Sequence, residues 1–286
     1  MKEWIGPKPT DLQRLLLAAC LEPDHTARKS WFEWLAACDF DREDTASIEL
    51  AGLAVGKLGI VAGESSEASR CRGWNRRAWY ISELSLDVGR RLNEAIRQRG
   101  LEAVAVGDLA TWSAGYRFAG RAFPVRRVEF DVFGSCQSEL NKLKSLPLPK
   151  VATQAIAARQ LPLAIHSSSI RLPTIKPANG PWAIPDAGTH VAWLAAKNWR
   201  RYPGGGLRWA LEILAAMNEY EDTTAMERSV VAAATQMRTT YAVSSALRLV
   251  GTLPGGYVSV PFSVAVESVP LSVFSMLRKW ANRLSV

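Results

Sequence analysis

Apolar residues recur with a helical period in the first part of the chain. The spacing predicts short helices over Asp11–Cys20, Ala27–Ala37 and Thr45–Leu58. In the second of these, Trp31 and Trp34 fall on one face at a spacing of three residues. The third follows the acidic segment DFDREDT, which suits the positive end of a helix dipole. The N-terminal region is therefore expected to be helical.

A longer amphipathic helix is predicted over Trp74–Arg99, and Gly100 is the residue expected to end it. Its polar side is rich in arginines. These arginines could bind phosphate, or they could form an ordinary solvent-exposed face. The polar segment GESSEASRCRG that precedes it is predicted to be a loop. The residues expected to line its apolar side are Trp79, Leu84, Val88, Leu92 and Ile96.

The period changes after this helix to patterns that are typical of strands. The segment LEAVAVGDLA predicts a short buried strand that turns into a helix at Gly107. The next predicted strand contains VEFDVF, in which Glu129 and Asp131 share one face and apolar residues share the other. A third strand is predicted over Leu161–Leu172.

The remainder is predicted to be helical after a proline-rich linker, Pro173–Pro185. We therefore expect an α+β protein with a small mixed β-sheet core between two helical regions. The boundaries are residues 1–99 for the N-terminal region, 100–175 for the α/β core and 176–286 for the C-terminal region. The helices expected in the last region are Gly188–Trp199, Leu207–Asn218, Met226–Tyr241, Ser245–Leu249 and residues 271–286.

Composition narrows the classes of protein. Of 286 residues, 48% are apolar and 22% charged, and no apolar run reaches the ~18 residues of a membrane span. We therefore expect a soluble, cytoplasmic protein without membrane partners. The four cysteines are scattered and only three histidines occur, which argues against a zinc site, a disulfide framework or a mechanism that needs several histidines.

The net charge of +8 is local in origin. Between Glu139 and Glu212 the only acidic residue is Asp186, whereas ten lysines and arginines occur. A phosphate-bearing partner would suit this span, and so would a simple solvated face. Nucleic-acid binding is not expected, because the chain has no recognisable module or basic–aromatic pattern for it.

The acidic pair Glu129 and Asp131 is the main candidate for chemistry. Carboxylates at i and i+2 of a strand point the same way and can bind magnesium, which prefers oxygen ligands. The alternatives are an ion pair with Arg126, Arg127 or Arg121 at an exposed strand edge, and the remains of a lost active site. The pattern alone leaves all three open.

The order of these elements resembles the DNA polymerase beta-like nucleotidyltransferases. It resembles more closely a family of uncharacterised bacterial nucleotidyltransferases found in biosynthetic gene clusters. The likeness begins with the tryptophan-bearing helix and acidic segment WFEWLAACDFDREDTAS, and includes the glycine turn, the VEFDVF strand and LAIHSSS. It extends to the helix LRWALEILAAM, so it covers most of the chain, by order and spacing more than by identity.

The resemblance implies a role for several residues. Glu129 and Asp131 match the metal-binding, catalytic pair, with Mg²⁺ as the implied cofactor and an NTP as substrate. Gly107 matches the turn glycine that lets the backbone approach phosphate, and Arg126 an arginine that neutralises charge. His166 matches a strand histidine that orients the acceptor or a ligand, although a hydrogen-bonded structural histidine is the alternative. Glu212 falls where the family has an aspartate.

The departures from the family pattern concern charge. Val106 stands where the family has a lysine before the turn glycine, and Glu129 replaces an aspartate. Ala164 stands in place of the third carboxylate, and no acidic residue occurs from Asn141 to Pro185. Two-metal phosphoryl chemistry needs enough carboxylates to hold both ions.

Two functions from different classes follow as expectations. The first is a Mg²⁺-dependent enzyme that transfers a nucleotidyl group from an NTP to a small-molecule or peptide acceptor in a biosynthetic pathway. The second is a non-catalytic nucleotidyltransferase-fold binding or scaffold protein, with a protein partner from the same pathway.

Overall fold

The protein is seen here as a computed structural model, and the placement of most of the chain is described. The described residues are 9–60, 66–118, 121–135, 137–158, 161–168, 170–171, 173–177, 179–200, 207–218, 223–251 and 253. Within them the chain is mixed α+β and mainly helical, as predicted.

Three short helices form the N-terminal part, and all three were predicted. They are α1 (Asp11–Leu21), α2 (Asp24–Ala37) and α3 (Thr45–Leu58). Helix α1 begins with a capping box, in which the hydroxyl of Thr10 accepts from the amide of Gln13 and the Gln13 side chain accepts from the Thr10 amide. This exchange satisfies two amides that would otherwise lack partners at the first turn.

Helix α4 (Ser66–Gln98) is the longest element and differs from the prediction in two ways. The segment predicted as a loop is helical from Ser66 onwards, since its Glu, Ala and Arg residues are good helix formers. Leu92 and Ile96 are buried as expected, but Trp79 is 66% exposed. The prediction for Trp79 was wrong because an apolar residue on a helix need not face the core.

A three-stranded sheet forms the centre of the α/β part. Its order is β1 (Glu102–Ala105), β4 (Val128–Phe133), β5 (Leu163–Ser168), with β1 antiparallel and β5 parallel to β4. The short helix α5 (Asp108–Ser113) follows β1. The strand that carries the acidic pair is therefore the central strand, so the alternative of an exposed edge strand was wrong.

The proline-rich segment predicted as a linker is attached to this sheet. Its ends form an antiparallel pair of two-residue strands, and Ala183 bridges to Val104 of β1. The remaining elements of this part are β2 (Arg117–Phe118), β3 (Arg121–Ala122), α6 (Gln137–Lys144), α7 (Lys150–Ala157), β6 (Thr174–Ile175) and β7 (Ile184–Pro185).

The C-terminal part is helical, with one break that the sequence pattern did not predict. The predicted helix Met226–Tyr241 is interrupted at Arg238, which has a positive φ of 55°. The predicted helix at residues 271–286 lies outside the described residues. No helix in the described ranges is both long and apolar enough to cross a membrane. The observed helices are α8 (Ala187–Arg200), α9 (Arg208–Asn218), α10 (Thr223–Gln236) and α11 (Thr240–Gly251).

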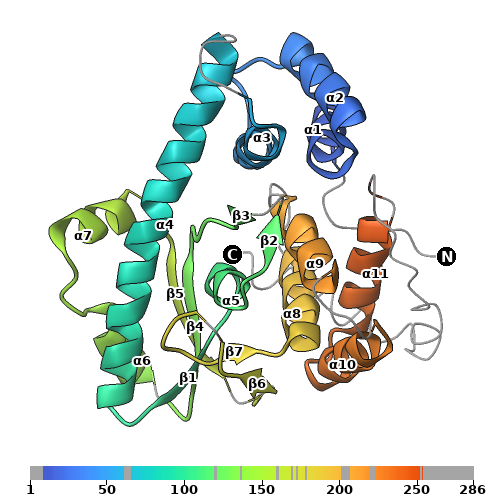
Figure 1. Ribbon diagram of the computed structural model, residues 1–286. Helices are drawn as coiled ribbons and strands as arrows, with labels where there is room; N and C mark the ends of the chain where they lie inside the picture. The colour runs from blue at the N-terminus through green and yellow to red at the C-terminus, as the bar shows by residue number, and fades with distance from the viewer. Residues whose placement is uncertain are drawn as a thin grey trace.

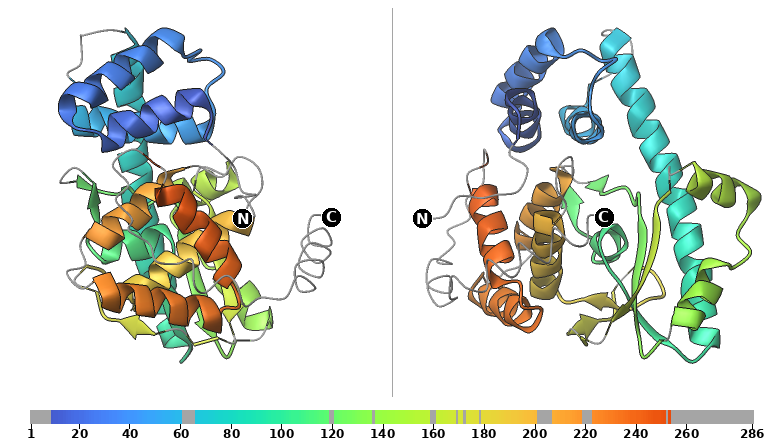
Figure 2. Two further views of the ribbon diagram at one scale, coloured as in Figure 1. Left: turned by 90° about the vertical axis from the view of Figure 1, so that its right-hand side faces the viewer. Right: turned by 180° about the vertical axis from the view of Figure 1, so that it is seen from behind.

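The elements are arranged in two tiers joined by α4 (Figure 1). Helices α1–α3 lie at one end of α4, and the sheet lies along its other half, with α8 across the sheet from α4. Helix α5 contacts α4 directly, since Leu109 lies against Gly89 and shares an apolar cluster with residues of α4. The view from behind shows the same arrangement, with α6 and α7 on the α4 side (Figure 2). The two faces of the sheet thus meet different surroundings.

The apolar face of β4 packs into the core on the α4 side. Val128, Phe130 and Val132 have no exposed surface, and they share an apolar cluster with residues of α4, α6 and α7. Burying each such side chain contributes about 1.5–3 kcal/mol relative to its exposure. This face fixes the strand register, so Glu129 and Asp131 must point to the opposite side.

A second apolar cluster joins the two helical regions. It contains residues of α1–α3 together with residues of α8–α11. Trp31 and Trp34 are fully buried in it, with ring centroids 5.1 Å apart. The N- and C-terminal helical regions therefore share one hydrophobic core, although the α/β core separates them in sequence.

Candidate functional site

The acidic pair lies on the face of β4 that is turned away from α4. Glu129 is almost fully buried, with 2% of its side chain exposed, whereas Asp131 is half-buried. A buried carboxylate needs partners, and Glu129 has two. Its Oε1 lies 3.2 Å from Nε2 of His166, and its Oε2 forms an ion pair with the ammonium of Lys197.

The sheet register accounts for the histidine contact. Strand β5 runs parallel to β4 with His166 opposite Asp131 and Ala164 opposite Glu129. His166 therefore lies on the same face as the acidic pair, with 54% of its side chain exposed. Ala164, which stands in place of the third carboxylate, lies directly beside Glu129 and brings no charge.

Lys197 reaches the acidic face from helix α8. Its side chain is only 18% exposed, and its ammonium lies 4.1 Å from the ring centroid of Trp193, one turn earlier on the same helix. The indole face adds a cation–π contact to the ion pair with Glu129. The ion pair predicted for the acidic pair is therefore present, but with a lysine of α8 in place of Arg126, Arg127 or Arg121.

The charged side chains of the site shift one another's pKa values. Burial tends to raise the pKa of Glu129, but the hydrogen bond with His166 and the charge of Lys197 outweigh it, so this pKa is lowered. The pKa of His166 is raised, mainly by its hydrogen bond to Glu129. Burial raises the pKa of Asp131, and the neighbouring Glu129 charge adds to the effect. Glu129 is thus held in its ionised form, whereas the ionised form of Asp131 is disfavoured.

Gly107 lies next to Glu129, at the turn between β1 and α5. Its φ is +61°, which favours glycine, and a Cβ there would be 3.2 Å from the Trp193 ring and 3.3 Å from Oε2 of Glu129. The structure brings Gly107 together with the acidic pair, as expected. The space in front of the turn, however, is filled by the indole of Trp193.

Arg126 does not join the acidic pair. It forms an ion pair with Glu49 of α3, and its backbone amide donates to Oδ2 of Asp108 at 2.9 Å. Asp108 in turn lies 3.8 Å from the guanidinium of Arg208 on α9. These residues, with Glu212, form a largely buried charge network that connects α3, α5, the segment just before β4, and α9.

Glu212 closes this network. Its carboxylate lies 2.7 Å from Nε of Arg208, and both side chains are nearly inaccessible to solvent. Burial, with repulsion from Asp108 and Glu49, raises the pKa of Glu212 to about 7, although Arg208 opposes the shift. Asp108 shows the reverse, since Arg208 and the Arg126 amide outweigh burial and lower its pKa. The arrangement connects the three parts of the chain, and within the described residues none of its members forms an ion pair with Glu129 or Asp131.

Two further polar-tipped ring side chains are buried away from the acidic pair. Trp209 lies in the core shared by the helical regions. His190, for which no role was predicted, is fully buried with Nε2 3.0 Å from the Thr111 hydroxyl. Burial lowers its pKa to about 4, so it is neutral near pH 7.

Several participants were missed by sequence reasoning, among them Lys197 and Glu49. Each of these two is the lone charged residue on a largely apolar stretch of helix, AWLAAK for Lys197 and SIELAGLAV for Glu49. A single charge within such a stretch is a signal that it has a buried partner. The sequence gives no indication of which residue that partner is.

Metal binding has no further support from side-chain clusters. In the part of the chain that the structure describes, no group of three or more His, Cys, Asp or Glu residues could hold a metal ion. No family model matches the chain, and no match to it was found among curated proteins or among solved structures.

Proposed function

We propose that this chain is a non-catalytic protein with a nucleotidyltransferase-like core, acting as a binding or scaffold component of a biosynthetic pathway. Support for the core comes from the order of its elements: a strand, a glycine turn, a helix, a strand with two carboxylates and a parallel strand with a histidine. This order agrees with the resemblance read from the sequence.

One observation carries the non-catalytic part of the proposal, namely the ion pair between Lys197 and Glu129. The resemblance implies Mg²⁺ at this carboxylate, but a lysine ammonium already lies against it. A divalent cation placed there would meet the positive charge of Lys197 at close range, and such repulsion is strong in a water-poor site.

The donor set around Glu129 also fails to fit magnesium. Mg²⁺ prefers near-octahedral oxygen coordination. Both oxygens of Glu129 are engaged, by His166 and Lys197, and Ala164 supplies no ligand. With Lys197 in place, Asp131 alone is left to bind the ion. The residues present therefore do not fit the metal centre that the resemblance implies.

The glycine turn is obstructed in a related way. In the family, such a turn lets a phosphate approach the backbone. Here the Trp193 ring occupies the position next to Gly107. Trp193 and Lys197 are one helical turn apart on α8, so a single face of this helix covers both the turn and Glu129.

A second candidate function is nucleotidyl transfer, with Glu129 and Asp131 as metal ligands. It is favoured by the position of both carboxylates and His166 on one face of the sheet. It requires Lys197 to leave Glu129 when the nucleotide and metal bind. The two candidates therefore predict opposite results for nucleotide binding by the native protein.

Calorimetry with each NTP in the presence of Mg²⁺ distinguishes them. We expect no Mg²⁺-dependent binding by the native protein and the same result for Asp131→Ala. Glu94→Ala, at an exposed position of α4, serves as a control for the same change in net charge. Mg²⁺-dependent NTP binding that is lost in Asp131→Ala, but kept in Glu94→Ala, would favour the enzyme and contradict the proposal.

A further inference from the structure

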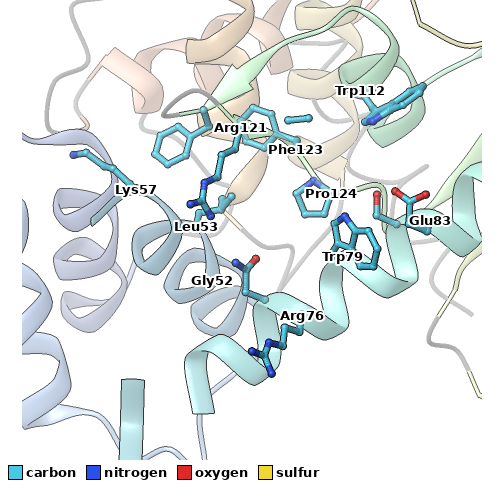
Figure 3. A pocket seen from close by; sticks show the side chains of 15 residues that line it. Gly52, Leu53, Lys57, Arg76, Trp79, Glu83, Trp112, Arg121, Phe123 and Pro124 are labelled. Carbon is cyan, nitrogen blue, oxygen red and sulfur yellow. The ribbon is translucent and has the colours of Figure 1, made fainter. Parts of the chain in front are cut away.

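A pocket of about 550 Å³ lies between helices α3 and α4 and the α/β part (Figure 3), and neither Glu129 nor Asp131 lines it. Its walls come from α3, α4, α5 and the β2–β3 hairpin with the two residues that follow it. This volume is within the range of pockets that bind small molecules. None of the site residues predicted from the sequence lines it.

The pocket is electropositive. Its walls carry Lys57, Arg76 and Arg121, against one carboxylate, that of Glu83. Within the described part of the chain, neither Arg76 nor Arg121 forms an ion pair or a side-chain hydrogen bond, whereas Lys57 donates to the carbonyl of Glu22. An unpaired guanidinium in a concave site favours an anion, because its planar N–H groups match a carboxylate or phosphate.

The position of Arg121 is well defined relative to α3. A Cβ built on Gly56 would lie 3.5 Å from Nη1 of Arg121. The arginine side chain therefore reaches across the pocket to α3, where it lies beside a residue without a side chain. One turn earlier, a Cβ on Gly52 would meet nothing within 4 Å. The two glycines thus leave room on the α3 wall next to the guanidinium.

Aromatic side chains form another part of the wall. Trp79 is 66% exposed, and Trp112 is half-buried. In Figure 3, Arg121 and Lys57 lie on one side of the pocket, and Trp79 and Trp112 on the other. Indole rings bind planar ring systems by stacking. Because Trp79 is mostly exposed, a stacked ligand would bury apolar surface that the protein core leaves uncovered.

We propose that this pocket binds a planar aromatic ligand that carries a phosphate or carboxylate group. The guanidinium of Arg121 holds the anionic group, and Trp79 contacts the ring. This proposal does not rest on the state of the acidic pair, since no residue is common to the two sites. It gives the protein a small-molecule site that sequence patterns did not indicate, because its walls come from segments far apart in the chain.

Titration calorimetry of the full-length protein tests the proposal with defined probes. AMP represents an aromatic phosphate and indole-3-acetate an aromatic carboxylate. Adenosine and inorganic phosphate supply the two halves of AMP, and indole and acetate those of indole-3-acetate. We expect at least one of the two complete probes to bind, and more tightly than either half. Absence of binding by both complete probes up to about 5 mM, which is weaker than ordinary specific recognition, overturns the proposal.

Variants of exposed residues locate the site without disturbing the core. Arg121→Ala and Trp79→Ala should each weaken binding at least about tenfold, as expected for loss of a charge-assisted hydrogen bond or a stacking contact. Arg77→Ala and Tyr80→Ala change neighbouring exposed residues of α4 that do not line the pocket, and should leave affinity unchanged. Equal effects of the two pairs of variants, or no effect of the first pair, would refute the assignment.

Discussion

Replacing Glu212 by glutamine tests the buried charge network through the pH dependence of stability. The pKa of Glu212 is about 7 in the folded protein, against an ordinary value of 4.5. Below pH 4.5 the carboxyl is protonated in both the folded and unfolded states, so its titration has no effect on stability. Between pH 4.5 and 7 the unfolded chain ionises while the folded protein retains the proton, so the free energy of unfolding falls as the pH rises.

The size of this effect follows from the shift. A change from 4.5 to about 7 corresponds to about 3 kcal/mol, at about 1.4 kcal/mol for each pKa unit. The Glu212→Gln variant lacks the titrating group but keeps a similar volume. Relative to the native protein, it should therefore gain about 3 kcal/mol of unfolding free energy between pH 4.5 and pH 8.

Urea unfolding of both proteins at pH values from 4.5 to 8 measures this difference. Glu33→Gln, at a half-exposed position of α2, provides the same chemical change outside the network. A difference between Glu212→Gln and native protein that is independent of pH would show that the pKa of Glu212 is the same in the folded and unfolded states. The reasoning about burial and the Asp108 and Glu49 charges would then be refuted.

Three other substitutions have defined outcomes in chemical denaturation. Gly107→Ala should lower the unfolding free energy by about 1–3 kcal/mol, because its φ of +61° is strained for alanine and Trp193 leaves little space; an unchanged midpoint would contradict this packing. Asp131→Asn should stabilise the protein at pH 7, since burial raises the pKa of Asp131, and the gain should shrink as the pH falls through this raised pKa and be absent below 3.8; a loss of stability at pH 7 would show that the carboxylate is needed as an anion. Trp34→Ala should cost about 3–5 kcal/mol, because the indole is fully buried in the core shared by the helical regions, and a cost below about 1 kcal/mol would contradict that burial.

The fold elements that the sequence predicted well are those governed by local periodicity. In VEFDVF the alternation of apolar and acidic residues follows directly from the two-residue period of a strand. It correctly placed Glu129 and Asp131 on one face, opposite the buried Phe130. Gly107 was placed correctly for a similar local reason, because the chain must turn sharply between β1 and α5.

The parts that the sequence did not predict depend on contacts between distant segments. Lys197 is 68 residues from Glu129, and no local pattern relates the two. Trp79 has the helical spacing of the apolar residues of α4, but its side chain faces a pocket formed with α3 and the β2–β3 hairpin. Likewise, periodicity predicts that a helix has an apolar face but not which helix covers it, so the core shared by the two helical regions was not foreseen.

The proposal for the acidic pair depends on Lys197 taking the place of a metal ion, and a titration with Mn²⁺ tests this most directly. Mn²⁺ uses the same oxygen ligands as Mg²⁺, and electron paramagnetic resonance counts the free ion. The native protein and the charge control Lys144→Met, on the exposed face of α6, should bind no Mn²⁺ at the acidic pair, whereas Lys197→Met frees Glu129 and should bind the ion more tightly than the native protein. Stoichiometric Mn²⁺ binding by the native protein that disappears in Asp131→Ala would contradict the central claim.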